Sequence, residues 1–270
     1  MADPQAVLLL RWMSHMHTVH LEDPDFGTAE DDRTMSYAQF QDQICWLDEQ
    51  WQQYCRTHPV IDLSQANLNG VVLNCINLPG ANCRGAVFCN ARLEGVSFQN
   101  ADLTNARFDG AFLKSMDKIN FAGANCQGAV FCNARLGNVS FQNANIAGAR
   151  FDKALLGDSG WVDFTGANLR GTRFDGATFN GVDIRGAKNL HMEQVFDAFD
   201  RNPSRVTCSP KMRAALLRMQ EIQTSGVEAQ DTLEDTWYRG LERPHPFMAP
   251  SEIQQIGRGR NPEEKFHKSS

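Results

Sequence analysis

The sequence contains one 22-residue stretch almost twice, and this repetition limits the fold more than any other feature. The stretch ANCRGAVFCNARLEGVSFQNAD begins at Ala81, and ANCQGAVFCNARLGNVSFQNAN begins at Ala124, 43 residues later. Eighteen of the 22 positions are identical. Self-similarity at a fixed distance is typical of repeat architectures, in which each unit buries its apolar side against its neighbours. We therefore expect a stack of equivalent units.

The stretch is itself built from units of five residues. From Ile61 to Gly186 the chain divides into 24 such units, interrupted by the three-residue insertions 116–118 and 159–161. The first place of a unit is nearly always Ala, Val, Ile or Thr, and the third is Leu or Phe, with Ile or Cys as exceptions. The other places are mostly polar residues or Gly. A period of five fits neither a helix, at about 3.6 residues per turn, nor a strand, at about 2.

The unit closely resembles that of the pentapeptide-repeat family, written A-(D/N)-L-X-X around a central Leu or Phe. The resemblance is to bacterial members, covers 61–188, and leaves helical extensions at both ends. It implies an all-β solenoid, a right-handed quadrilateral β-helix of about six coils. Each unit would form one side of a coil, with its first and third places inward. Two coils of twenty residues and one three-residue corner loop account for the offset of 43, which indicates a duplicated two-coil block.

Every fourth unit then shares a side, which sorts the third places into four ladders. Two ladders are rich in Phe and two are almost wholly aliphatic, so large and smaller side chains can interdigitate at crystal-like density. The residues predicted to form the structural core are Phe88, Phe98, Phe108, Phe121, Phe131, Phe141, Phe151, Phe164, Phe174, Leu93, Leu113, Leu136 and Leu156.

The cysteines of the repeats are expected on both the inner and the outer face of the wall of the solenoid. Cys83 and Cys126 occupy third places and are expected inside, whereas Cys89 and Cys132 occupy fourth places and are expected just outside the core. Ligands on opposite faces of a wall do not chelate one ion, so we interpret these residues as small core thiols. Eight cysteines in 270 residues do not suggest a disulfide framework.

Residues 1–60 are expected to form an acidic, partly helical N-terminal cap, because a solenoid end exposes apolar core and unpaired backbone. Ser36 and Gln39 match a capping box. Apolar residues then recur at helical spacing as far as Tyr54. A membrane-surface helix is the alternative, which the absence of Lys and Arg from the polar face disfavours. Residues 22–34 are interpreted as an acidic loop.

The repeats are followed by a C-terminal helical segment, 189–242, and a flexible tail, 243–270. One helix is expected over 191–200, a second after Ser209 as N-cap, and a third over 233–241. These helices exceed what one cap needs. A small helical domain, a homodimer contact and a partner-binding element are the alternatives.

No catalytic, cofactor-binding or metal-binding residues are predicted. His15, His17 and His20 are close together in HMHTVH, but no Cys or second His pair lies at ligand spacing. The sequence lacks a Gly-rich phosphate loop, G-x-S-x-G and H-E-x-x-H. We therefore expect neither an enzyme nor a protein that binds a cofactor or a small-molecule substrate.

One side of the predicted rod breaks the repeat rule at its polar second places. Phe112 and Leu155 stand there among Val72, Arg92 and Arg135. A docked terminal helix of the chain itself is one explanation, and a partner-binding patch is the other. The candidate partner-binding residues are Phe112, Leu155, Arg92, Arg135 and Trp161, the last from the second corner loop.

The distribution of charge along the chain favours some functions over others. The segment 1–60 has a net charge of −7, whereas 61–190 has a net charge of +2, with twelve basic and ten acidic residues. Some members of the family mimic duplex DNA to bind DNA gyrase or topoisomerase IV, and this mimicry requires negative charge along the rod. That function, with topoisomerase inhibition or quinolone protection, is kept as the alternative. A nucleic-acid ligand is disfavoured by the net negative charge of the whole chain and by the lack of an extended basic patch.

The favoured prediction is a non-enzymatic scaffold that binds another protein, such as a secretion-system effector or an adaptor. No apolar run is long enough to span a membrane. The stretch AVLLL near the N-terminus lacks the basic start and the cleavage site of a signal peptide. We expect a cytoplasmic protein, with export by a signal-peptide-independent secretion system as the alternative.

Overall fold

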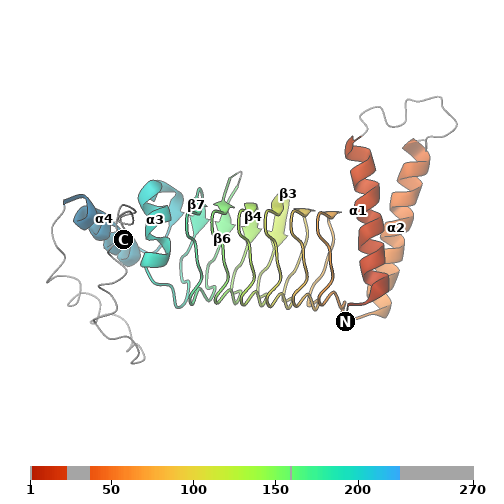
Figure 1. The fold of residues 1–270 in the computed structure, drawn as a ribbon, viewed down its shortest axis with the longest axis horizontal. Coiled ribbons are helices and arrows are strands. Elements are labelled where there is room, and N and C mark those ends of the chain that lie inside the picture. The colour runs from red at the N-terminus through yellow and green to blue at the C-terminus, as the bar shows by residue number, and fades with distance from the viewer. Residues whose placement is uncertain (1, 23–36, 159, 226–270) are drawn as a thin grey trace, which may run out of the picture. The chain divides into compact units, whose positions relative to one another are not determined.

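The computed structural model of the chain describes residues 2–22, 37–158 and 160–225 (Figure 1). The chain divides into two units, Met1–Gln220 and Glu221–Ser270, and the first contains all the repeats. The elements, in order, are α1 (Pro4–Glu22), α2 (Tyr37–Thr57), β1 (Val72–Asn74), β2 (Arg92–Glu94), β3 (Phe112–Asn120), β4 (Arg135–Ser140), β5 (Leu155–Leu156), β6 (Val162–Asp163), β7 (Thr178–Phe179), β8 (Val182–Asp183), α3 (Glu193–Arg201), the short 3₁₀ helix η1 (Pro203–Arg205), β9 (Val206–Thr207) and α4 (Pro210–Ser225).

The repeats form a right-handed parallel β-solenoid with four sides, which confirms the predicted fold class. Each rung pairs in parallel with the rung one coil later, as Val72 does with Arg92 and Arg92 with Phe112. We number the sides one to four in the order in which the chain first visits them from Ile61. The second-place residues of side four form seven rungs, Asn77, Ser97, Asn120, Ser140, Asp163, Asp183 and Thr207. The solenoid therefore has about seven turns.

The corners explain the polar fifth place of the unit. Residues there have positive φ, for example 56° at Asn90 and 65° at Gly110. This left-handed conformation is easy for Gly and tolerated by Asn. The next residue closes the turn, as when the N–H of Ala91 donates to the C=O of Phe88 at 3.1 Å. The preference for Asn and Gly is thus a requirement of the corner.

The two insertions lie at one corner, between sides three and four. The first is a bulge within β3, whose register with β4 shifts between Lys114 and Ile119. The second joins β5 to β6. Both corner loops lie where the 43-residue offset predicts them.

The interior is built from stacked rings. Phe108 and Phe131, one coil apart on side two, stack with centroids 4.8 Å apart and planes 3° apart. Phe121, on side four, meets both rings edge-on, at 5.8 and 6.0 Å. All thirteen residues assigned to the core from the sequence are buried.

Helix α1 contacts the first coil. The N–H of Asp3 donates to the C=O of Asp62 at 2.7 Å, and the N–H of Val72 donates to Ser14 Oγ at 2.8 Å. The buried residues of the two N-terminal helices continue the core of the rod and are Ala6, Leu9, Leu10 and Met13 of α1 and Leu47, Trp51 and Tyr54 of α2. These helices therefore close the apolar end of the rod.

The C-terminal end contains an extra rung that the repeat pattern does not predict. After the last unit, α3 buries Val195 and Phe199, and the chain returns as β9, which pairs with β8. The N–H of Ile184 donates to the C=O of Thr207 at 2.8 Å. Ser209 Oγ accepts the N–H of Met212 at 3.2 Å, which confirms Ser209 as the N-cap of α4.

Several expectations lie outside the described residues. They are Ser36 of the predicted capping box, the acidic loop as far as it extends beyond Glu22, the helix over 233–241 and the tail 243–270. The side chains of His17, His20 and Gln39 are likewise not described, whereas His15 is exposed.

Candidate protein-binding surface

The second places of side three carry the residues that broke the repeat rule. They follow one another on successive rungs as Val72, Arg92, Phe112, Arg135 and Leu155. Such places face away from the core, because their neighbours Leu93, Leu113, Leu136 and Leu156 fill it. Four of the five candidate residues therefore form one continuous column.

An aromatic ring between two cations is the centre of this column. The guanidinium carbon of Arg92 lies 5.5 Å from the centroid of the Phe112 ring, and that of Arg135 lies 5.6 Å from it. Phe112 is half-buried. Cation–π contacts of this kind at exposed sites are worth about 0.5–1 kcal/mol each. The ring thus holds two long cationic side chains in place on the surface.

The C-terminal end of the column is joined to the second corner loop. Arg135 forms a salt bridge of 2.5 Å with Asp158, and Leu155 is the next rung and is partly exposed. The pairing between the two strands is direct, since Arg135 is opposite Leu155. The sequence did not mark Asp158 as part of this surface.

The fifth candidate residue, Trp161, brings the two corner loops together. Its side chain is 40% exposed, and Lys118 Nζ from the first corner loop lies 5.1 Å from the centroid of its ring. Lys118 was also missed from sequence, although its position in a predicted corner loop was a usable signal. We call Arg92, Phe112, Lys118, Arg135, Leu155 and Trp161 the corner patch.

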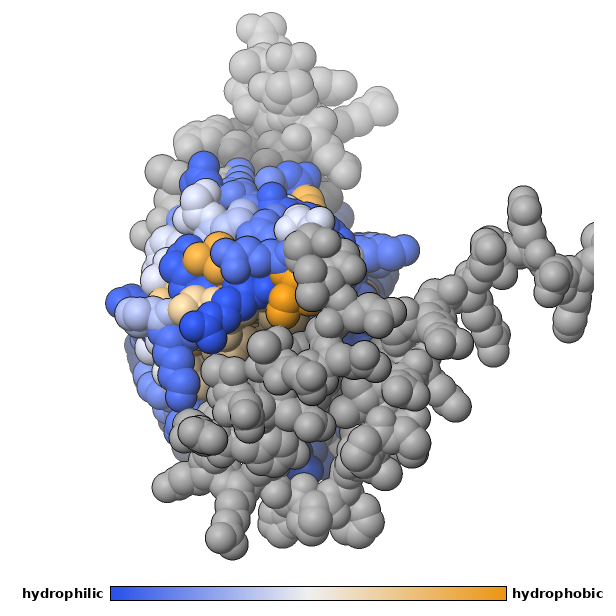
Figure 2. Space-filling view, turned by 90° about the vertical axis from the view of Figure 1, so that its left-hand side faces the viewer, coloured by the Kyte–Doolittle hydropathy of each residue, from blue (hydrophilic) through white to orange (hydrophobic). Residues whose placement is uncertain are grey.

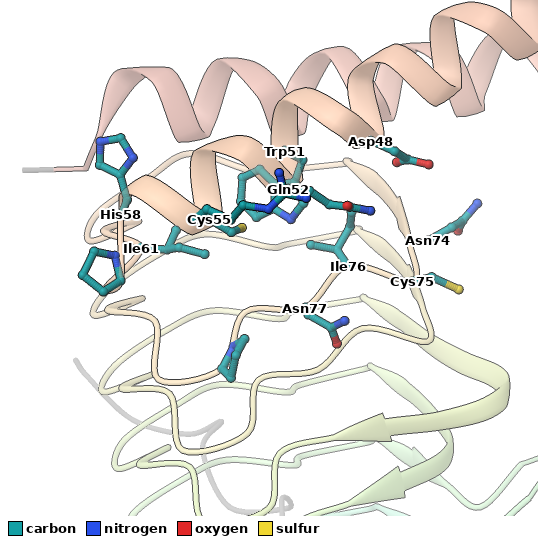
Figure 3. Close-up of a pocket in the computed structure, with 13 residues that line it drawn as sticks. Asp48, Trp51, Gln52, Cys55, His58, Ile61, Asn74, Cys75, Ile76 and Asn77 are labelled. Carbon is teal, nitrogen blue, oxygen red and sulfur yellow. The ribbon is translucent and has the colours of Figure 1, made fainter.

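A second hollow lies where α2 crosses the first coil. It has a volume of 470 Å³ and lies between the α2 side chains Trp51 and Gln52 and the coil residues Ile76 and Asn77 (Figure 3). Sequence reasoning missed this groove completely. The residues that line the groove come from α2 and from the first coil, and no sequence motif links these two segments.

The buried cysteines of the repeats are poor candidates for reactive thiols. Cys83 and Cys126 are fully buried, and burial raises the pKa of both thiols well above the ordinary value. Cys89 lies against Asp109, with Sγ 3.5 Å from the carboxylate, and its pKa is also raised, chiefly by burial. A raised pKa leaves the thiol protonated and a poor nucleophile. Among the described residues, no group of three or more His, Cys, Asp or Glu side chains is placed to hold a metal ion.

A homodimer contact is one of the alternatives predicted for the C-terminal helices. Figure 2 shows described residues there that are mostly hydrophilic, with hydrophobic atoms in small separate areas. Leu217 of α4 is 40% exposed. A homodimer through these helices stays a prediction. None of the helices that the structure describes has the length and apolar composition needed to cross a membrane.

Comparisons with known proteins agree with the repeat pattern. The family model for pentapeptide repeats matches residues 81–115, 119–158 and 160–188, in eight copies. No curated protein matches the sequence.

Similar solved structures are also repeat proteins. One is a pentapeptide repeat protein, Rfr23, from the cyanobacterium Cyanothece 51142, with 19% identity, 48% of this chain and 93% of that chain covered, and a TM-score of 0.31. Another is QnrB1, a plasmid-mediated fluoroquinolone resistance protein, with 14% identity, 60% and 99% covered, and a TM-score of 0.31. A third is HetL from Nostoc sp. strain PCC 7120, involved in heterocyst differentiation regulation, with 20% identity, 49% and 72% covered, and a TM-score of 0.18.

Proposed function

This chain belongs to the pentapeptide-repeat family, and we propose that its rod is a non-enzymatic scaffold that binds another protein through the corner patch. The observation that carries the proposal is the Phe112 ring between Arg92 and Arg135, on the outside of the rod. The Phe112 ring is not needed to fill the core, because its neighbour Leu113 points inward and is fully buried.

The composition of the corner patch is that of a binding surface. Residues that dominate protein interfaces are enriched in Trp and Arg and combine apolar area with a cationic group. Trp161, Phe112 and Leu155 supply the apolar area. Arg92 and Lys118 are exposed cations, which favours a partner with acidic residues around an apolar contact.

The two corner loops give this surface a fixed frame. Backbone pairing along β3 and β4 holds the rungs in register, and Lys118 lies over the ring of Trp161. A preformed surface loses little conformational entropy on binding, which favours affinity. The two sets of flanking helices suit an adaptor or a secreted effector, since both classes join a binding rod to another segment.

The test compares the intact chain with a Phe112→Arg, Leu155→Arg double variant in an affinity pull-down from the native cell, read by mass spectrometry. The matched control is Val87→Arg, Val130→Arg, which places the same charges at partly exposed second places of side two. Circular dichroism must show both variants folded. We expect a specific partner that the control retains and the double variant loses. A partner that both variants retain would remove the corner patch as the binding surface.

A further inference from the structure

Each coil of this solenoid offers hydrogen bonds to the coil before it. On side four, the N–H of Ser97 donates to the C=O of Ile76 at 2.9 Å, and its C=O accepts the N–H of Leu78 at 2.7 Å. The same pattern recurs on side one, where the N–H of Asn82 donates to Ile61 and its C=O accepts from Leu63. A second-place residue therefore presents both backbone groups toward the preceding coil.

The first coil has no preceding coil, and α1 together with Asp3 just before it supplies one hydrogen bond on each of three sides. The N–H of Asp3 reaches the C=O of Asp62 on side one. On side two, an Arg11 guanidinium nitrogen donates to the C=O of Asn67 at 2.7 Å. On side three, Ser14 Oγ accepts the N–H of Val72.

Side four lacks such a hydrogen bond among the described residues. Asn77 is its second-place residue and is exposed. Within the described part of the chain, neither its backbone N–H nor its C=O has a hydrogen-bond partner. An unpaired donor and acceptor on one strand edge are a template for another strand. Among the described residues, Asn77 is therefore the second-place residue of the first coil for which neither backbone group is paired, whereas one group is paired on each of the other three sides.

The open rung borders the groove beside α2. Figure 3 shows Ile76 and Asn77 on the coil facing Trp51, Gln52 and Cys55 of the helix. The groove volume of 470 Å³ falls within the range of about 300–1,000 Å³ found for ligand sites. Trp51, Ile61 and Ile76 are buried apolar residues of its lining. The charged lining residues Asp48 and Arg56 oppose each other in sign, so no strong field selects a charged ligand.

We propose that this groove binds an extended peptide segment of another protein, which adds a parallel strand to side four of the first coil. The open backbone pair of Asn77 selects an extended backbone, as in β-strand addition. Every pairing among the described residues of the rod is parallel, which sets the direction.

The rod's own pairing rule predicts the peptide's chemistry. The middle residue of the bound tripeptide takes a second place and faces solvent. Its neighbours face inward, toward Trp51 and Ile61, so small or aliphatic residues fit there. The residue before the middle one accepts the N–H of Asn77 through its C=O. The residue after it donates its N–H to the C=O of Asn77.

The proposal is independent of the corner patch, and its test uses the intact protein. Heptapeptides are selected from a random phage-displayed library, and the strongest binder is synthesised. Its affinity is measured for the natural chain and for two pairs of variants. Asn77→Pro removes the N–H and blocks the edge, whereas Asn77→Ala keeps the backbone. Gln52→Trp fills the groove, whereas Gln53→Trp adds the same bulk on an α2 residue outside the groove lining.

We expect Asn77→Pro and Gln52→Trp to weaken binding about tenfold or more, the equivalent of one backbone hydrogen bond, and their partner variants to leave it unchanged. N-methylation of the peptide residue after the middle one should have the same effect, and methylation of the middle residue none. The N-methylated peptides test the hydrogen bond without a change in the protein, so the fold of the protein is the same in every measurement.

Three results would overturn the proposal. They are the absence of any selected binder, binding that survives Asn77→Pro, and binding that is insensitive to the site of N-methylation. A natural chain that self-associates in sedimentation, and becomes monomeric on Asn77→Pro, would instead identify a second copy as the occupant.

Discussion

At the scale of single residues, the solenoid assigns one task to each place of its five-residue unit. The third place fills the interior, and on two sides it does so with stacked rings. Phe131 lies between Phe108 and Phe151, 4.8 Å from the centroid of each. Phe121 and Phe141 meet its edges. Because the coils above and below are fixed by backbone pairing, the structure has little freedom to collapse around a missing ring.

Replacing Phe131 with Ala should therefore destabilise the rod strongly. Removing a buried Phe side chain costs about 3–5 kcal/mol, and the cost is highest where the cavity cannot close. Phe131→Leu replaces the ring with the side chain found at most third places of the aliphatic sides. We expect it to lower the free energy of unfolding by clearly less than Phe131→Ala does. Urea unfolding followed by far-ultraviolet circular dichroism measures both. Equal losses for the two variants would show that stacking does not constrain the cavity.

At the scale of elements, the repeat made most of the rod predictable. Counting in fives assigns each residue to a side, so the ladders and the corner of the two insertions follow from the sequence alone. The rung at Val206 does not, because the chain reaches it only after α3 and no unit marks it. Phe112 and Leu155 were found because they occupy polar places. The groove beside α2 was not, since it depends on how a helix crosses the first coil.

One charge-assisted hydrogen bond links the start of α1 to α2, beside the buried apolar residues of the two helices. The Tyr54 hydroxyl donates to Asp3 Oδ2 at 2.6 Å, and Asp3 Oδ1 accepts the N–H of Gln5 at 2.8 Å, at the start of α1. The hydrogen bond from Tyr54 is the main cause that lowers the pKa of Asp3. A carboxyl group with a lowered pKa in the folded state stabilises that state above its unfolded pKa, about 3.9. This stabilisation is lost as the pH falls through the folded-state value.

Tyr54→Phe should lower the free energy of unfolding by about 1–2 kcal/mol at pH 7, because it removes the hydrogen bond and keeps the ring. The difference from the natural chain should shrink as the pH falls below about 4, where Asp3 of the unfolded chain becomes protonated, and its charge-dependent part should be lost below the lowered pKa of Asp3 in the folded state. Chemical denaturation at a series of pH values measures this. Asp3→Asn is the control and should lack the same pH-dependent component. A difference that stays constant from pH 7 to pH 3 would contradict the role of the ionised carboxylate.

At the scale of the whole molecule, the charges are separated along the chain. The first sixty residues carry most of the excess negative charge, and the rod carries a small positive excess. Among the described residues of the rod, six acidic residues form salt bridges with arginine, which reduces the negative charge that the rod presents. The acidic partners are Asp102, Asp109, Asp152, Asp158, Asp175 and Asp183.

This charge pattern argues against mimicry of duplex DNA. The duplex carries about one negative charge per 1.7 Å of its axis, and a mimic must present a comparable row. We therefore expect no inhibition of DNA gyrase in a supercoiling assay at micromolar protein, with a quinolone as the positive control. A mobility-shift measurement on the same plasmid excludes an effect through DNA binding. Dose-dependent inhibition by the folded protein, without a shift of the plasmid, would contradict the expectation. It would move the binding surface from the corner patch to an acidic segment outside the rod, such as residues 1–60.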